Sequence, residues 1–197
     1  MDDTAAFARD LEAVLAAGDV AAVLLRLTEA DQRTTINRIK NVAAIVHCRD
    51  IALLVDGRPE IVARADADGA HLTGIEALRA ALPTLKPGRI AGAGGLHSRH
   101  DAMLAGEADA DYVMFGEPDH GGSGGRPSLE SLVERLTWWA ELFQPPCIGY
   151  AAGKDEVRAL AEAGADFVAL GEWIWTQRGE SDRAVVAASD ILAAIVA

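Results

Sequence analysis

The sequence predicts an α/β fold, a (βα)8 TIM barrel formed by a single domain that spans residues 1–197. Short apolar runs typical of buried strands alternate with segments of helical periodicity, which is the pattern of a parallel sheet covered on both faces. A helix end, an Ala-Asp pair and a strand follow one another three times. A chain of 197 residues is also long enough to bury one sizeable core. The three copies begin at Ala67-Asp68, Ala110-Asp111 and Ala165-Asp166.

A doubly wound open sheet is the competing architecture. The barrel is favoured because repeated helix-to-strand turns of one kind indicate a wheel of similar units. It is also favoured because no Gly-x-Gly-x-x-Gly motif follows the first strand of the sequence.

The first half of the chain alternates in this way from its beginning. Residues 4–17 carry apolar side chains at helical spacing, and Gly18 ends that predicted helix. Residues 20–27 are an apolar run with Arg26 near its end. Pro59 suits the first turn of a helix, and Pro83 is expected to end one. The predicted order is helix 4–17, strand 20–27, helix 30–46, strand 51–55, helix 59–65, strand 69–72 and helix 75–82.

The second half of the chain begins with the clearest unit of the sequence, residues 89–117. Gly94 and Gly95 end an apolar run, Ser98 can cap the following helix, and Gly116 ends the next strand. A glycine-rich loop, 119–127, comes next and contains His120, which is expected at the surface. The predicted order is strand 89–93, a helix from Ser98 through 104 and beyond, strand 111–116, helix 128–143, strand 146–150, helix 154–163, strand 167–171 and helix 182–196.

The sequence predicts eight helices but only about seven strands. The chain begins with a helix, and no strand precedes it. A (βα)8 barrel needs a strand before that helix to close its sheet, so we expect the barrel to lack its first strand. Either the native chain starts upstream of Met1, or a partner strand or a collapsed barrel closes the gap. The first alternative is favoured, because Asp2-Asp3-Thr4 resembles the loop after a strand.

Composition and charge exclude several classes of function. The net charge is −12 and the pI is about 4.7, which argues against nucleic acid as a partner because phosphate backbones require a basic surface. No run is long enough to span a membrane and no signal peptide is recognisable, so a cytoplasmic location is expected. Cys48 and Cys147 lack metal-ligand spacing and are expected to be small buried hydrophobic residues.

Three stretches resemble the thiamine-phosphate synthase and thiazole tautomerase family. They are residues 56–74 (DGRPEIVARADADGAHLTG), 95–116 (GLHSRHDAMLAGEADADYVMFG) and 145–170 (PPCIGYAAGKDEVRALAEAGADFVAL). The resemblance runs from about Val20 to Ile174 and implies a compact (βα)8 barrel. It also implies one of two activities: a synthase that joins hydroxymethylpyrimidine diphosphate to thiazole phosphate with magnesium, or a tautomerase that aromatises a carboxylated thiazole phosphate without metal.

Much of the family's synthase motif set is replaced in this sequence. Where the resemblance places Gln-x-Arg-x-Lys, the residues are Leu24 to Thr28, and only Arg26 remains. Asp56-Gly57 stands where synthases have Asn-Asp, which includes a magnesium ligand. The second magnesium carboxylate falls on Glu76. Tyr150-Ala151 replaces a phosphate-binding Gly-Gly, Glu172 replaces a serine, and Pro118 to Gly122 replaces a segment with threonines and a lysine.

The candidate site residues are therefore drawn from strand ends and from the resemblance. His97 aligns with the acid-base histidine of the tautomerases, a role that suits an imidazole, although a structural role in the turn is the alternative. Arg26 lies at a strand end and is expected either to bind an anion or to form a buried ion pair. Asp56 and Glu76 could share a cation, which by resemblance would be magnesium. The predicted ligand-binding residues are Arg26, Asp56, His71 and Glu76, and the predicted phosphate-binding residues, through backbone amides, are Ala151, Ala152, Gly153 and Gly171.

Two functions follow from these residues. The first is binding of a small phosphorylated heterocycle in or near thiamine biosynthesis, with synthase or tautomerase activity. Of these two activities, the replaced motifs argue against the synthase. The second is a non-catalytic barrel that acts as a binding or interaction module. A homo-oligomer is also considered, because exposed strand edges favour association. In either case, Arg26, Asp56, His71, His97, Glu117 and Glu172 are expected near one mouth of the barrel.

Overall fold

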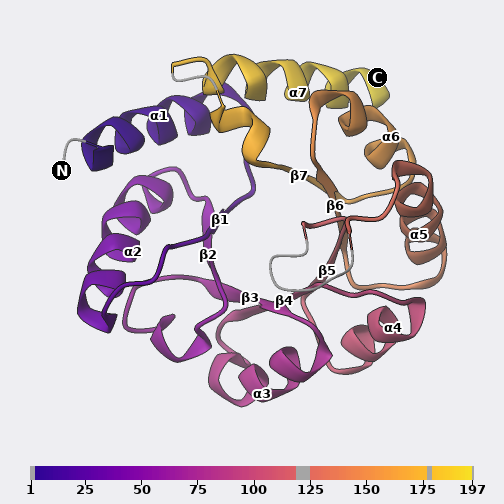
Figure 1. Ribbon diagram of the computed structural model, residues 1–197, viewed down its shortest axis with the longest axis horizontal. Coiled ribbons are helices and arrows are strands. Elements are labelled where there is room, and N and C mark those ends of the chain that lie inside the picture. Colours follow the sequence, from indigo (N-terminus) through magenta and orange to yellow (C-terminus); the bar gives the residue numbers. More distant parts are fainter. Residues whose placement is uncertain (1–2, 119–124, 177–178, 197) are drawn as a thin grey trace.

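Seven parallel strands alternate with helices in the computed structural model, which describes residues 3–118, 125–176 and 179–196 (Figure 1). The strands are β1 (Ala22–Leu25), β2 (Ala52–Asp56), β3 (Gly69–Thr73), β4 (Ile90–Gly94), β5 (Tyr112–Phe115), β6 (Cys147–Ala151) and β7 (Phe167–Leu170). The α-helices are α1 (Asp3–Ala17), α2 (Gln32–His47), α3 (Ile75–Leu85), α4 (Arg99–Glu107), α5 (Leu129–Leu142), α6 (Val157–Glu162) and α7 (Ser181–Val196). Three 3-10 helices complete the set, η1 (Pro59–Ile61), η2 (Lys154–Glu156) and η3 (Glu172–Trp175).

Each strand pairs in parallel with the next one in the sequence, so the sheet order is β1-β2-β3-β4-β5-β6-β7. The helices form a ring outside the curled sheet (Figure 1). This is the α/β TIM-like fold that the sequence predicts, with one strand fewer than a complete barrel among the described residues. Within those residues β1 and β7 do not pair with each other, whereas α1 and α7 pack together and close the outer ring at this seam.

Alternation along the strands produces two apolar layers. In β2, Leu53 and Val55 face the helices and belong to the large outer core, whereas Leu54 belongs to a separate cluster inside the curled sheet. Tyr112 of β5 and Tyr150 of β6 lie in the same inner cluster. Because both faces of the strands are covered, the strands are nearly continuous apolar runs, as expected for a parallel sheet.

The three Ala-Asp pairs make one contact that is repeated at the N-terminal ends of the strands. Each aspartate donates its backbone amide to a carbonyl of the preceding strand and accepts the amide of the same residue with its carboxylate. The contact joins β2 to β3, β4 to β5 and β6 to β7. The partners are Asp68 with Leu53, Asp111 with Ala91 and Asp166 with Cys147, at Oδ2–N distances of 2.7, 2.7 and 2.8 Å.

Several element boundaries differ from the prediction. The helix predicted at 59–65 is only the 3-10 turn η1, and residues 62–66 continue as turns up to Asp66, which has a φ of 60°. Pro83 does not end its helix: α3 continues to the buried Leu85. The helix predicted at 154–163 is divided into η2 and α6. Ser98 caps α4 as predicted, and Ser128, the first residue of the helix predicted at 128–143, caps α5.

The two cysteines differ in environment. Cys147 is buried as predicted, and burial raises the pKa of its thiol to about 11. The prediction for Cys48 is wrong, because this residue follows the last turn of α2 and is exposed, with its thiol donating to the Ile45 carbonyl at 3.0 Å. Residues 119–124 of the glycine-rich loop, including His120, lie outside the described residues. In the described part of the chain, no helix combines the length and apolar character that crossing a membrane requires.

Candidate functional site

Charged side chains gather where the parallel strands end. Arg26 directly follows β1, Asp56 is the last residue of β2, His71 lies in β3, and Glu117 comes two residues after β5. Parallel strands bring their C-terminal ends to one edge, which is where (βα)8 barrels place their active sites. We call Arg26, Asp56, His71, Tyr112 and Glu117 the mouth cluster.

Arg26 is held between two carboxylates from different strands. Its Nε atom donates to Asp56 Oδ2 at 3.0 Å, and its Nη2 atom donates to Glu117 Oε1 at 2.6 Å. The side chains of Arg26 and Asp56 are 28% and 29% exposed, whereas that of Glu117 is 8% exposed. The guanidinium is therefore fixed at the rim of the barrel by charge-assisted hydrogen bonds.

Glu117 also receives hydrogen bonds from inside the mouth. The Nε2 atom of His71 lies 3.1 Å from its Oε2 atom, and the Gly95 amide donates to the same oxygen at 3.2 Å. Burial alone would raise the pKa of the Glu117 carboxyl. The hydrogen bond and charge of His71, the charge of Arg26 and the Gly95 amide outweigh burial, so this pKa lies below its ordinary value. Glu117 is therefore an anion at neutral pH.

His71 is fully buried and connects Glu117 to Tyr112. Its Nδ1 atom lies 2.8 Å from the Tyr112 hydroxyl. An ionised carboxylate can only accept, so the Nε2 atom of His71 carries a proton and donates it to Glu117. Burial, with the charges of Glu117 and Asp56, raises the pKa of Tyr112, which keeps this hydroxyl protonated. The mouth cluster is thus one hydrogen-bonded chain from Tyr112 to Asp56.

Two glycines in β4 make room for the mouth cluster. A Cβ atom on Gly92 would lie 1.9 Å from Cζ of Tyr112, and one on Gly94 would lie 1.8 Å from Oε2 of Glu117 and 2.3 Å from Nε2 of His71. No residue with a side chain fits at these positions without displacing the cluster. Glycine inside a strand is a known mark of such close approach, and it is the sequence signal that could have identified Tyr112 as part of the site.

A second ion pair lies at the ends of β5 and β6. Arg126 donates through Nη1 and Nη2 to the two carboxylate oxygens of Glu156, at 2.7 and 2.6 Å. It also donates to the carbonyls of Gly116 at 2.7 Å and Tyr150 at 2.8 Å. Burial would raise the pKa of Glu156, but Arg126 and the Ala152 amide lower it below its ordinary value. Neither residue of this pair was predicted from the sequence to be part of the site.

The predicted phosphate-binding residues meet at this second ion pair and beside β7. The Ala152 amide donates to Glu156 Oε2 at 2.8 Å, and the Gly171 amide donates to the Ala151 carbonyl at 2.9 Å. The Gly153 carbonyl accepts the Glu156 amide at 3.2 Å. Phosphate binding at these residues stays a prediction, and a phosphate that used the Ala152 amide would have to displace the Glu156 carboxylate.

Two other predicted residues lie outside the mouth cluster. His97 is exposed in the loop after β4, where its carbonyl accepts a hydrogen bond from Arg135 at 3.3 Å. Glu76, in the first turn of α3, has a side chain that is 88% exposed and lies 3.9 Å from Arg79. The structure thus joins Arg26, Asp56 and His71 by hydrogen bonds but joins neither His97 nor Glu76 to them. A catalytic role for His97 stays a prediction.

Glu117 and Glu172 were both expected near the mouth of the barrel, but only Glu117 belongs to the mouth cluster. Glu172 begins η3 directly after β7 and is exposed. Its backbone amide contacts the Tyr150 hydroxyl, whose pKa is raised chiefly by burial. The Tyr150 hydroxyl also fills the space beside Gly171, where a Cβ would lie 2.7 Å from it.

The two carboxylates that the resemblance assigns to magnesium lie in different surroundings. The Asp56 carboxylate is bound to Arg26, and Glu76 is on the exposed surface of α3. Among residues 3–118, 125–176 and 179–196, no three histidine, cysteine, aspartate or glutamate side chains are grouped as metal ligands. Magnesium prefers near-octahedral oxygen ligands, and a carboxylate already paired with a guanidinium is poorly suited to supply one.

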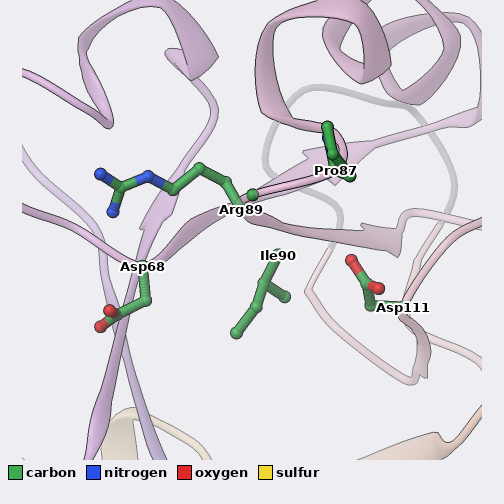
Figure 2. Close-up of a pocket in the computed structure, with 6 residues that line it drawn as sticks. Asp68, Pro87, Arg89, Ile90 and Asp111 are labelled. Atoms are coloured by element: carbon green, nitrogen blue, oxygen red, sulfur yellow. The ribbon is translucent and has the colours of Figure 1, made fainter.

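A hollow of about 300 Å³ lies at the opposite end of the sheet, where β3, β4 and β5 begin. Figure 2 shows Asp68, Arg89 and Asp111 around it. Both carboxylates accept strand amides, and Arg89 donates to the Ala67 carbonyl. These polar groups already hold the sheet together, so the mouth cluster is the better candidate for a functional site.

Comparison with known proteins agrees with the geometry. The sequence profile described as thiamine monophosphate synthase matches residues 1–174. The chain is 37% identical over 180 residues to the thiamine-phosphate synthase of Rhodospirillum centenum, covering 88% of this chain and 84% of that protein. It is 33% identical over 199 residues to the thiamine-phosphate synthase of Erythrobacter litoralis, covering 98% and 92%. The structure of thiamine phosphate pyrophosphorylase from Pyrococcus furiosus superposes with a TM-score of 0.79 at 22% identity, covering 96% of this chain and 91% of that one, which shows the shared fold.

Proposed function

The chain belongs to the thiamine monophosphate synthase family, and from this premise we propose that it binds a phosphorylated heterocycle of thiamine biosynthesis at the mouth of the barrel. Family membership itself supports a role in thiamine biosynthesis. The finer proposal concerns the ligand, which by family is a phosphorylated pyrimidine or thiazole.

The observation that carries this proposal is the fixed position of Arg26. Asp56 and Glu117 orient its guanidinium at the C-terminal ends of the strands, beside the buried His71. A planar guanidinium held in one orientation is suited to bind a phosphate through paired hydrogen bonds. The position is also the one at which (βα)8 barrels bind their substrates.

Isothermal titration calorimetry tests the proposal with four ligands: thiazole phosphate, its carboxylated form, hydroxymethylpyrimidine diphosphate and thiamine phosphate. We expect at least one to bind, and Arg26→Ala to weaken it by about 10- to 100-fold, because a hydrogen bond to a charged group contributes about 1.5–3 kcal/mol. Arg158→Ala is the matched control, since Arg158 forms an exposed pair with Glu162 at 3.5 Å. Absence of binding for all four ligands would contradict the proposal.

A non-catalytic binding role is the second candidate, and one observation favours it. The charged groups of the mouth are paired within the chain: Arg26 with Asp56 and Glu117, and Arg126 with Glu156. Synthase and tautomerase assays with the ligand that binds separate the candidates. Binding without turnover in either assay supports the binding module, whereas turnover that is lost in His97→Ala but kept in His100→Ala supports tautomerase chemistry at His97.

A further inference from the structure

We propose that Glu117 is a built-in occupant of an anion-binding site, and that a ligand's phosphate or carboxylate group binds at the mouth by displacing it. This inference deepens the proposed function and rests on it for the identity of the natural ligand. The site itself follows from the contacts of Glu117 alone.

Three donors converge on the Glu117 carboxylate from three different parts of the fold. Arg26 after β1 contributes a guanidinium N–H at 2.6 Å, His71 in β3 contributes a ring N–H at 3.1 Å, and Gly95 after β4 contributes a backbone N–H at 3.2 Å. A guanidinium, an imidazole and a backbone amide aimed at one point are the donor set with which proteins bind carboxylates and phosphates.

The donors do not depend on Glu117 for their positions. Arg26 is also held by Asp56 at 3.0 Å, and His71 is also held by Tyr112 at 2.8 Å. The Gly95 amide is placed by the turn at the end of β4, where Gly95 has a φ of 61°. Removal of the Glu117 side chain therefore leaves the donors in place around a space of the size of one carboxylate.

The occupant comes from a separate element and is brought in by a turn. Gly116, with a φ of 90°, ends β5 and directs Glu117 toward the mouth. The carboxylate is more than nine-tenths buried, and its lowered pKa keeps it ionised at neutral pH. An incoming anion must therefore compete with a tethered carboxylate that has a high effective concentration. Glu117 thus sets a threshold that excludes small free anions and admits only ligands with additional contacts.

Chemical rescue tests this inference with the full-length chain and needs no thiamine-related ligand. In Glu117→Ala, formate and inorganic phosphate should bind in the vacated site and raise the melting temperature in a saturable way by a few degrees, because ligand binding to the folded state stabilises it. The wild type should show no saturable shift. Glu162→Ala, which removes a carboxylate from an exposed pair, is the matched control and should respond like the wild type.

A lack of any saturable shift in Glu117→Ala would overturn the inference. If that variant does not fold without added anion, folding that requires formate supports the site. If it does not fold even with formate, Glu117→Gln decides the question: its uncharged side chain should yield to phosphate and give a saturable rise in melting temperature that the wild type lacks. An equal response to phosphate in the two proteins would overturn the inference. Since these probes are not thiamine intermediates, a failure here is distinct from a failure of the titrations above.

Discussion

At the N-terminal ends of the strands the same aspartate contact occurs three times, whereas the C-terminal ends hold one cluster of unlike side chains. Asp68, Asp111 and Asp166 each bind the backbone of the preceding strand. The mouth cluster instead joins side chains that are far apart in the sequence: Arg26 and Glu117 are separated by 91 residues. One end of the barrel is built from a repeated local motif, and the other from charges that occur once.

The contacts at the N-terminal ends of the strands stabilise the sheet, whereas the cluster at the C-terminal ends is the candidate functional site. The aspartates satisfy backbone amides that would otherwise be buried without a partner. The mouth cluster places charges at the edge where barrels of this kind bind substrates. The resemblance to the family implies that several synthase motif residues are replaced at this same end, whereas the Ala-Asp pair occurs three times at the other end.

The largest expected effect concerns synthase activity. We expect little or no formation of thiamine phosphate with magnesium, because Thr28 and Asp56-Gly57 replace the lysine and the Asn-Asp pair that the resemblance implies. Loss of a single group that stabilises transition-state charge costs about 10²–10³ in rate. A purified assay beside the Rhodospirillum centenum synthase measures the difference. Complementation of a synthase-deficient strain at normal expression would contradict the expectation and remove the functional contrast between the two ends.

The next effect tests whether the mouth needs its glycines. A methyl group on Gly94 would lie 1.8 Å from the Glu117 carboxylate and 2.3 Å from His71. Gly94→Ala should therefore lower the free energy of unfolding by about 1–3 kcal/mol or more and abolish ligand binding. Gly88→Ala is the matched control, because nothing lies within 4 Å of its Cβ position. Urea unfolding of both variants gives the comparison, and equal stability would show that the mouth cluster adapts easily.

The N-terminal ends of the strands were more predictable from the sequence than the C-terminal ends. The strand boundaries and the Ala-Asp repeat were predictable because apolar runs and repeats are local patterns. Arg26, Asp56 and His71 could be placed near the mouth because they lie at or near strand ends. Their bonding to Glu117 and Tyr112 could not be derived, since it depends on how distant strands curl together. Gly92 and Gly94 were the one local sign of that packing.

A smaller effect is expected at the N-terminal end. Asp166→Ala leaves the amide of the fully buried Cys147 without its carboxylate acceptor, which should destabilise the protein by about 1–3 kcal/mol. Asp166→Asn keeps an acceptor oxygen and should lose less. Ligand affinity should be unchanged in both variants, because the residue lies at the end of the sheet opposite the mouth. A loss of affinity that exceeds the loss of stability would show that the two ends are coupled.

The smallest expected effect concerns the pH dependence of the contribution that the Arg126–Glu156 ion pair makes to stability. Arg126 and the Ala152 amide hold the pKa of Glu156 below the value of 4.5 that is ordinary for glutamate. A carboxyl whose pKa is lowered in the folded state stabilises the protein at pH above its unfolded pKa, and this contribution disappears as the pH falls through the folded pKa. Glu156→Gln should therefore be less stable than the wild type by about 1 kcal/mol at pH 7, and the difference should shrink below pH 4.5.

Urea unfolding at pH 7, 5, 4 and 3.5 measures this difference in stability. Glu162→Gln is the control, because its exposed pair should contribute nothing measurable at any of these pH values. A difference between wild type and Glu156→Gln that stays constant down to pH 3.5 would mean that the Arg126 contact acts through shape rather than charge.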